Sequence, residues 1–197
     1  SSRGGERDYF AELDNFPNVK VIYLHAREII ERLGDGTLDL GISGLDLLKE
    51  SSKNLQQRIV VRKKLDFGKA NLVVAVPNDW IDVQTVADLE EISFYFRDKK
   101  NLRLRVATKY PNLTNSFFTS KGVTYYKIIS SLGATETYPF TGSSEIITDI
   151  VSTGATLKAN NLRILKDGSI LQSYACILTS KKSISNLKKR KMINMFL

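Results

Sequence analysis

Residues 19–50, "VKVIYLHAREIIERLGDGTLDLGISGLDLLKE", decide the fold because β-branched runs alternate in them with helical patterns. The run 19–24 predicts a strand, and the helix after it has one apolar face and Gly34 as its C-terminal cap. Residues 37–44 predict a second strand that ends in glycines, and "LDLLKE" predicts a second helix. This β-α-β-α order is typical of α/β proteins with largely parallel sheets.

The same alternation continues along the rest of the chain. Pro111 and Gly122 mark the start and the end of one predicted helix, and Ser143 or Ser144 caps another. A turn at 166–169 is expected to join the last two strands. Strands are expected at 58–65, 71–77, 102–110, 123–129, 162–165 and 170–179, and helices at 83–92, 111–122 and 143–153.

Composition narrows the classes of function. The chain has 197 residues, 42% of them hydrophobic and 25% charged, which suits one large domain or two small lobes. No apolar run approaches the roughly 20 residues of a membrane span, and no signal peptide opens the sequence. Cys176 is the single cysteine and lies in an apolar run, which predicts a reduced thiol in a cytoplasmic protein. His25 is the single histidine, so a His/Cys metal cage is excluded and a Ser-His-Asp triad is disfavoured.

The net charge of +8 is concentrated near one end. Residues 181–197 carry six basic residues and no acid, which leaves +2 for residues 1–180. A solvated helix face is favoured over a nucleic-acid-binding or membrane-binding segment, because aromatic residues are not interleaved with the basic ones. A docking surface for an acidic protein partner is the intermediate interpretation.

Residues 149–160, "DIVSTGATLKAN", combine an acid with a small-residue loop. Gly154 allows a positive φ that turns successive N–H groups inward at the start of a new helix, which predicts an anion site with hydroxyls from Ser152, Thr153 and Thr156. If 143–153 is helical, Asp149 lies about one helical turn away, where it could accept hydrogen bonds from the ribose of a sugar 5-phosphate. The alternative is a plain inter-helix turn with a surface carboxylate. Neither a Walker loop nor a G-x-G-x-x-G fingerprint is present.

These residues carry a resemblance to a known family. The stretch "DIVSTGATLKANNL" (149–162) resembles the phosphoribosyl-diphosphate motif of ATP phosphoribosyltransferase. Four further blocks agree in order and together span most of the chain: "GTLDLGISGLDLL" (36–48), "LDFGKANLVVAVP" (65–77), "RVATKYPNLTNSFF" (105–118) and "LGATETYP" (132–139). The family's usual opening strand with a Lys-Gly-Arg segment has no match, so we expect the natural start to be missing.

The resemblance implies a two-lobed, periplasmic-binding-protein-like (type II) α/β fold with a cleft between the lobes. Residues 1–76 plus 169–197 are expected to form the first lobe, and 77–168 the second lobe, with the phosphoribosyl-diphosphate loop. The reaction implied is attack by N1 of the adenine of ATP on C1 of phosphoribosyl diphosphate, with release of pyrophosphate and Mg²⁺ present. This is the first step of histidine biosynthesis, and it needs no side-chain nucleophile.

The resemblance also implies site residues. Phosphoribosyl diphosphate is expected at Asp149, Ser152, Thr153, Gly154, Ala155, Thr156 and Leu157. ATP is expected at Gly44, Asp46, Lys109, Tyr110 and Glu136, although a turn and helix cap at 44–46 and a solvated strand end at 109–110 are the alternatives. Arg3 and Arg7 could stabilise the leaving pyrophosphate, with terminal disorder as the alternative. No direct metal ligand is assigned.

The resemblance also implies partners, and two rival functions remain as alternatives. The chain resembles the short form of the family, which works with a regulatory subunit similar to histidyl-tRNA synthetase, in a homo-oligomer or hetero-oligomer. ATP and phosphoribosyl diphosphate are the expected partners as substrates; nucleic acid and membrane are not expected. The rivals are a non-catalytic solute- or effector-binding domain of the same fold, which has no need of "DIVSTGAT", and a nucleic-acid-binding module that uses the basic segment.

Overall fold

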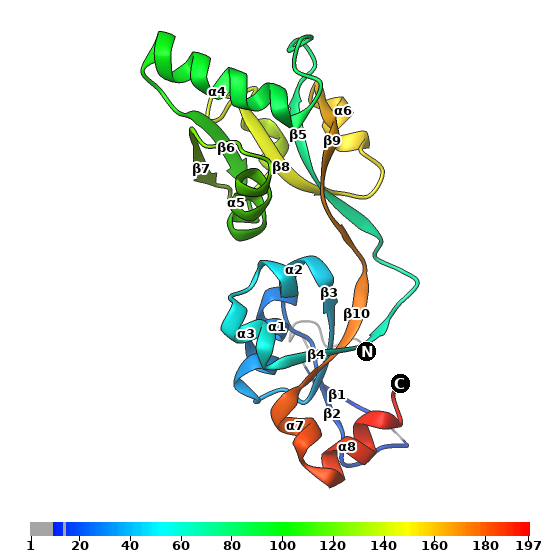
Figure 1. Ribbon diagram of the computed structural model, residues 1–197. Helices are drawn as coiled ribbons and strands as arrows, with labels where there is room; N and C mark the ends of the chain where they lie inside the picture. The colour runs from blue at the N-terminus through cyan, green and yellow to red at the C-terminus, as the bar shows by residue number, and fades with distance from the viewer. Residues whose placement is uncertain (1–9, 14) are drawn as a thin grey trace.

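The structure, a computed structural model, describes residues 10–13 and 15–197. Figure 1 shows two lobes, each built around its own sheet. The first contains the strands β1 (Phe10–Glu12), β2 (Lys20–Ile22), β3 (Leu40–Gly44), β4 (Ile59–Lys64) and β10 (Ala175–Ser180), and the helices α1 (Ala26–Asp35), α2 (Leu45–Glu50), α3 (Lys53–Gln57), α7 (Lys181–Ser185) and α8 (Leu187–Asn194). Strands β3, β10 and β4 form a sheet in that order, and β1 pairs with β2.

The second lobe has a five-stranded sheet in the order β7-β6-β8-β5-β9. Its strands are β5 (Ala70–Pro77), β6 (Leu104–Thr108), β7 (Tyr126–Ser130), β8 (Ile146–Val151) and β9 (Leu162–Ser173), and its helices are α4 (Val86–Lys100), α5 (Pro111–Ser120), α6 (Ala155–Ala159) and the short 3₁₀ helix η1 (Thr135–Thr137). Its buried core lies on both faces of the sheet, around Phe118 and Leu89 on one side and around Leu157 and Ile147 on the other.

The α/β class is confirmed, but the expected largely parallel pairing is wrong. Strand β6 is parallel to β7 and β8, whereas β5 is antiparallel to β8 and β9, and β10 is antiparallel to β3 and β4. The antiparallel pairs of β9 with β5 and of β10 with β3 and β4 arise where the chain returns between the lobes (Figure 1), whereas the pairs of β5 with β8 and of β1 with β2 are antiparallel within one lobe. Pairing of this kind joins distant parts of the sequence, so local pattern does not reveal it.

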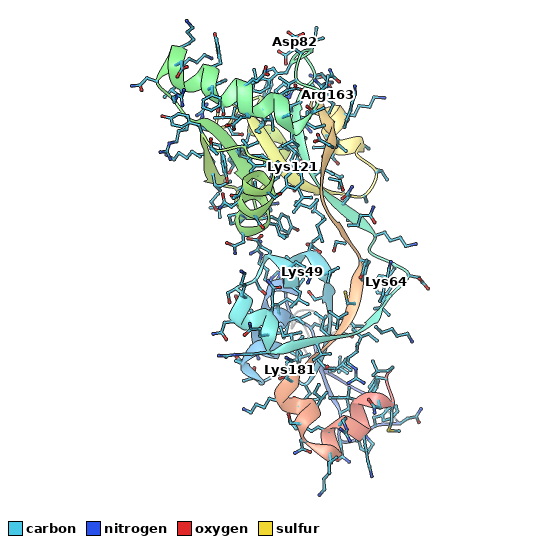
Figure 2. All side chains as sticks on the ribbon, viewed as in Figure 1. Lys49, Lys64, Asp82, Lys121, Arg163 and Lys181 are labelled. Carbon is cyan, nitrogen blue, oxygen red and sulfur yellow. The ribbon has the colours of Figure 1, made fainter. Side chains whose placement is uncertain are left out.

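The chain passes between the sheets after Lys64, the last residue of β4, and again at Tyr174 (Figures 1 and 2). Strand β5 pairs with β8 and β9 from Ala70 onwards, and β9 remains paired up to Ser173. The predicted division placed 70–76 and 169–173 in the first lobe, whereas their strand pairing is in the five-stranded sheet. The rest of that division stays a prediction.

The expected turn at 166–169 is a bulge inside the continuous strand β9. Ser169 pairs with Val73 and Ile164 with Ala75, so four residues of β9 lie opposite the single Val74. The extra residues are used locally, because Asp167 Oδ1 accepts the N–H of Val86 at 2.8 Å and so caps α4. The turn-forming residues 166–169 therefore mark an irregularity of the backbone, as predicted, but it is a bulge within one strand and not a turn between two strands.

One helix cap is also displaced. Helix α1 continues through Gly34 to Asp35 and is capped by Gly36, whose φ of +81° is left-handed. At Gly34 a Cβ atom would lie 2.1 Å from Leu55 Cδ1, so that glycine is needed for close packing against α3. The predicted cap at Gly34 is wrong because sequence alone does not separate these two uses of glycine.

Candidate functional site

The loop that follows β8 has the conformation expected of an anion site. Gly154 has a φ of +74° and immediately precedes α6. A Cβ atom there would meet nothing within 4 Å, so the backbone conformation, not crowding, favours glycine. The predicted positive φ and the predicted helix start after the loop are confirmed.

Several N–H groups of the loop are available to a ligand. The Lys158 N–H donates to Gly154 O at 3.1 Å, which is the first intrahelical bond of α6. The amides of residues 154–157 therefore have no partner within the helix, and of these the Ala155 N–H donates a long hydrogen bond of 3.4 Å to Thr153 Oγ1. The side chains of Ser152, Thr153 and Thr156 are exposed, whereas Leu157 is 2% exposed and packs into the core, so only its backbone can contact a ligand.

Asp149 lies on a strand, and the predicted helix over 143–153 is wrong. Residues Ile146–Val151 form β8, in which Val73 of β5 pairs with Asp149. The run Ile-Ile-Thr-Asp-Ile-Val is mostly β-branched, and β-branched residues favour strands, although the apolar spacing also fits one helix face. As a result Glu145 and Asp149 do not share a helix face, and Glu145 instead forms an ion pair with Arg105 at 2.6 Å.

The environment of Asp149 disfavours its charge. Burial raises the pKa of the Asp149 carboxyl above its usual range, and the nearby Glu136 raises it further. Two features lower that pKa and offset part of the rise: the Ile150 N–H, which donates to Asp149 Oδ1 at 2.8 Å, and the positive charge of Lys109. A half-buried carboxylate of this kind is typical of ligand sites.

A pocket joins these groups. It encloses about 420 Å³ of empty space, part of it open to solvent. The loop and the two carboxylates form its wall, which is lined by Glu136, Asp149, Ile150, Val151, Ser152, Thr153, Gly154, Thr156 and Leu157. Among these are six of the seven residues predicted for phosphoribosyl diphosphate, and Glu136 from the group predicted for ATP. Ala155 is not in the lining.

A buried chain of hydroxyls holds the strand ends beside this pocket, and the sequence analysis missed it. Thr148 Oγ1 of β8 donates to Thr108 Oγ1 of β6 at 2.7 Å and is 2.6 Å from Thr114 Oγ1 of α5. Thr108 Oγ1 also accepts the N–H of Tyr110 at 2.9 Å. All three threonines are 0% exposed. A sequence signal existed for Thr108, which alternates with the apolar Leu104 and Val106 in its predicted strand, because buried hydroxyls require partners, but Thr148 gave none while 143–153 was assigned to a helix.

The other predicted residues lie where the two lobes meet. Asp46 of α2 accepts a hydrogen bond from Tyr110 Oη at 2.8 Å and another from Ser173 Oγ at 2.6 Å. Asp46 and Tyr110 are both buried, and burial beside Asp46 raises the pKa of Tyr110 strongly. Gly44 permits the arrangement, because a Cβ there would lie 2.3 Å from Asp46 Oδ1. These residues connect the lobes directly and do not line the loop pocket.

Lys109 lies near both the loop pocket and the contact between the two lobes. Its backbone oxygen accepts from Arg27 Nη2 of α1 at 2.7 Å, and its charge acts on Asp149. It therefore lies between the loop pocket and the contact of the two lobes. Arg3 and Arg7 lie outside the described residues.

The carboxylates of the pocket could hold a magnesium ion only together with a bound substrate that supplies further oxygen ligands. Among the residues that the structure describes, no group of three or more His, Cys, Asp and Glu side chains is placed to hold a metal. Mg²⁺ commonly binds through one or two carboxylates together with substrate phosphates, and Asp149 and Glu136 supply two. Within the same part of the chain, no helix has the length and apolar character of a bilayer span.

Comparison with known sequences gives a consistent family. The sequence profile described as ATP phosphoribosyltransferase matches residues 25–197. The chain is 49% identical over 179 residues to an ATP phosphoribosyltransferase of Nitrobacter winogradskyi, an alignment that covers 91% of this chain and 55% of that protein. It is 46% identical over 181 residues to one of Mesorhizobium japonicum, with 91% and 78% covered. The chain thus spans little more than half of the length of the first relative.

Solved structures support the fold. A chain of the ATP phosphoribosyl transferase (HisG:HisZ) complex from Thermotoga maritima superimposes with a TM-score of 0.72 at 24% identity, over 98% of this chain and 82% of that one. A probable amino-acid ABC transporter extracellular-binding protein from Bacillus subtilis gives a TM-score of 0.51 at 12% identity, over 87% and 72%. The expected two-lobed, periplasmic-binding-protein-like fold is confirmed.

The burial of Asp149 predicts a stability effect that depends on pH. Because the folded state raises the pKa of this carboxyl, its charge destabilises the fold wherever it is ionised in both states. That cost is fully present above the folded pKa and disappears as the pH falls below the ordinary value of 3.8. Asp149→Asn should therefore raise the melting temperature at neutral pH and have little effect near pH 3.8.

Thermal melts across this pH range measure the effect. The control is Asp82→Asn, which replaces an exposed carboxyl at the far end of the second lobe (Figure 2) and should leave the melting temperature unchanged. A lower melting temperature for Asp149→Asn at neutral pH would show that hydrogen bonds to the carboxylate outweigh its burial.

Proposed function

This chain belongs to the ATP phosphoribosyltransferase family, and we propose that it transfers the phosphoribosyl group of phosphoribosyl diphosphate to N1 of ATP. The observation that carries the proposal is the loop 152–157, with its left-handed Gly154, in one pocket with the half-buried Asp149. In this reaction the bond from N1 of adenine to C1 of the ribose forms, and the bond from C1 to the pyrophosphate oxygen breaks. The electron pair of that bond leaves with pyrophosphate.

The loop suits the 5-phosphate of the ribose. The amides of residues 154–157 lack intrahelical partners, and the hydroxyls of Ser152, Thr153 and Thr156 are exposed beside them. Such a set of donors binds a phosphate without a formal positive charge. Because Ala155 contributes an amide at the start of α6, it can take part without lining the pocket through its side chain.

Asp149 suits the ribose hydroxyls. A carboxylate beside a phosphate is unfavourable for phosphate alone, but it accepts hydrogen bonds from the 2- and 3-hydroxyls of a sugar phosphate. Binding would also replace the water that burial has removed from Asp149. This pairing of an acid with an anion site therefore selects a sugar phosphate over inorganic phosphate.

Catalysis by positioning fits the remaining groups. Cys176 is buried in the first lobe, so it cannot serve as a nucleophile at this pocket. Transfer to N1 requires the two substrates to be aligned and the developing charge on pyrophosphate to be neutralised. Lys109, between the pocket and the contact of the lobes, is placed to hold an anionic group of either substrate. Mg²⁺ bound with the diphosphate would neutralise the charge of the leaving group.

Pyrophosphate release is the direct test of this function. The purified chain should release pyrophosphate only when ATP, phosphoribosyl diphosphate and Mg²⁺ are all present. Asp149→Asn should weaken phosphoribosyl diphosphate binding by about 1.5–3 kcal/mol, the range for a lost hydrogen bond to a charged group. Titration calorimetry measures that change. Binding of a small solute without turnover would favour the solute-binding alternative, and an unchanged dissociation constant would remove Asp149 from the site.

A pair of glycines separates loop conformation from general stability. Gly154→Ala should cost about 1–2 kcal/mol for a left-handed residue, and if the loop relaxes to avoid that cost, phosphoribosyl diphosphate binding should weaken by about 5- to 30-fold. Gly122→Ala is the matched control, because Gly122 has a φ of +80° and equally open surroundings but follows α5, outside the pocket. Both variants should melt earlier, and only Gly154→Ala should bind more weakly. Equal binding by the two variants would reduce the loop to an ordinary turn.

The proposal includes a separate regulatory protein similar to histidyl-tRNA synthetase. Support comes from the fold neighbour of Thermotoga maritima, which was solved as a HisG:HisZ complex. A surface of six exposed basic residues could meet an acidic face of such a partner: Lys181, Lys182, Lys188, Lys189, Arg190 and Lys191. One of them, Lys189, already forms an ion pair with Asp39 at 2.8 Å.

The regulatory proposal predicts that histidine alone does not inhibit the isolated chain, because the sensing site is assigned to the partner. It also predicts that binding of the partner weakens as salt rises, because salt screens exposed charges. A histidine titration of pyrophosphate release, with and without the partner, measures the first effect. Full inhibition of the purified chain by histidine would place the sensing site within the chain and overturn this assignment.

A further inference from the structure

Glu50 is a buried acid with an unusual set of partners. It is the last residue of α2, it is 5% exposed, and the sequence analysis did not assign it to any site. Its Oε1 accepts the N–H of Asn112 at 2.9 Å and its Oε2 accepts the N–H of Leu113 at 2.9 Å. Both oxygens of the carboxylate are therefore used by the first turn of α5.

The two amides are groups that α5 cannot satisfy by itself. The first N–H groups of a helix have no intrahelical acceptor, and the helix dipole makes that end favourable for a negative charge. Hydrogen bonds to an ionised acceptor are stronger than neutral ones. A third bond, from Asn112 Nδ2 to Glu50 O at 2.8 Å, fixes the orientation of the two helix ends.

These bonds cross from one lobe to the other. Helix α2 packs in the lobe of the three-stranded sheet, and α5 packs in the lobe of the five-stranded sheet (Figure 1). One helical turn before Glu50, Asp46 accepts from Tyr110, the residue that precedes α5. Both acids of α2 thus contact the start of one helix, where the chain has just passed Lys109.

The start of α5 is connected to the proposed substrate site, although no residue of α5 lines the pocket. The hydroxyl chain of Thr114, Thr148 and Thr108 ties α5 to β8, the strand that carries Asp149. A shift of α2 against α5 would therefore change how the first lobe lies against the elements that carry Asp149, while the pocket itself, which is lined by residues 136–157, stays intact. Glu50 touches no residue of the pocket lining directly through these bonds.

We propose that Glu50 is a positioning residue, which holds the two lobes in the arrangement of this structure by binding the free amides at the start of α5. In this arrangement Asp46 of the first lobe accepts a hydrogen bond from Tyr110, and Arg27 of the first lobe donates one to the backbone oxygen of Lys109, at the edge of the phosphoribosyl-diphosphate site. This inference deepens the proposed function, and only its kinetic consequence rests on that function.

Amide hydrogen exchange tests the contact independently of any activity. In Glu50→Gln, the side-chain NH₂ group must face one of the two amides, so the exchange of Asn112 and Leu113 should be faster by about tenfold or more. The matched control is Glu145→Gln. Glu145 accepts the N–H of Arg105 at 2.7 Å, but that contact lies entirely within the second lobe. The control should leave the exchange of Asn112 and Leu113 unchanged after correction for any change in global stability.

Steady-state kinetics test the consequence for the site. If Glu50→Gln populates an open arrangement, substrate binding must supply the closing free energy, so KM for phosphoribosyl diphosphate should rise by about tenfold with kcat nearly unchanged at saturation. Glu145→Gln should leave both constants as in the unsubstituted chain. Unchanged exchange at both amides overturns the contact, and faster exchange with an unchanged KM overturns the positioning role.

A milder variant covers the case in which Glu50→Gln does not fold. Asn112→Ala removes only the bond from Asn112 Nδ2 to Glu50 O and leaves the carboxylate in place. It should accelerate exchange at Leu113 by a smaller factor, and no acceleration would count against the contact. If the unsubstituted chain shows no turnover at all, the proposed function fails, and the exchange measurements still decide whether Glu50 holds the lobes together.

Discussion

The arrangement of the two lobes depends on carboxylates that are buried between them. Asp46 and Glu50 are one helical turn apart on α2, and both lie among residues of the opposite lobe, at 9% and 5% exposure. Removing two carboxylates from water is costly unless each finds donors. The donors here are the Tyr110 hydroxyl, the Ser173 hydroxyl and two amides of α5. Each of these groups belongs to the second lobe, so burial of the two carboxylates is compensated by contacts between the lobes and not within α2.

The proposed site has two electrostatically different parts, a loop of hydrogen-bond donors and a pair of carboxyl groups. The loop 152–157 offers backbone amides and hydroxyls to the proposed anion, while Asp149 and Glu136 place carboxyl groups in the same pocket. A ligand that carries both a phosphate and neighbouring hydroxyls satisfies these opposed requirements, and a ligand with only one of them does not. Burial raises the pKa of Asp149, which means that the surroundings of the free site disfavour the charged carboxylate. Such a site gains selectivity because it is destabilised without its ligand.

The sequence predicted the loop better than it predicted the element that presents it. A small-residue turn with glycine at the left-handed position has few conformations, so Gly154 was assigned correctly from local chemistry. The run before it was assigned to a helix, because Ile146, Ile147, Ile150 and Val151 also fall on one helical face. Only the neighbouring strands β5 and β6 decide between the two, and their pairing with β8 joins residues about 40 to 80 positions apart in the chain. Glu50 and the threonine chain escaped notice for the same reason, since their partners come from other elements.

Residues at and near the start of α5 both resemble the family and form the contacts between the lobes. Sequence blocks at 36–48 and 105–118 resemble the family separately, and the structure brings them into contact through Asp46 with Tyr110 and through Glu50 with Asn112 and Leu113. Transfer of a phosphoribosyl group without a covalent enzyme intermediate has to be accelerated by the alignment of two bound substrates. In a two-lobed fold that alignment is a relation between lobes and not a property of either pocket. Under the proposed function, the residues that set this relation contribute to the transfer together with those proposed to bind the phosphate, even though they lie outside the loop pocket.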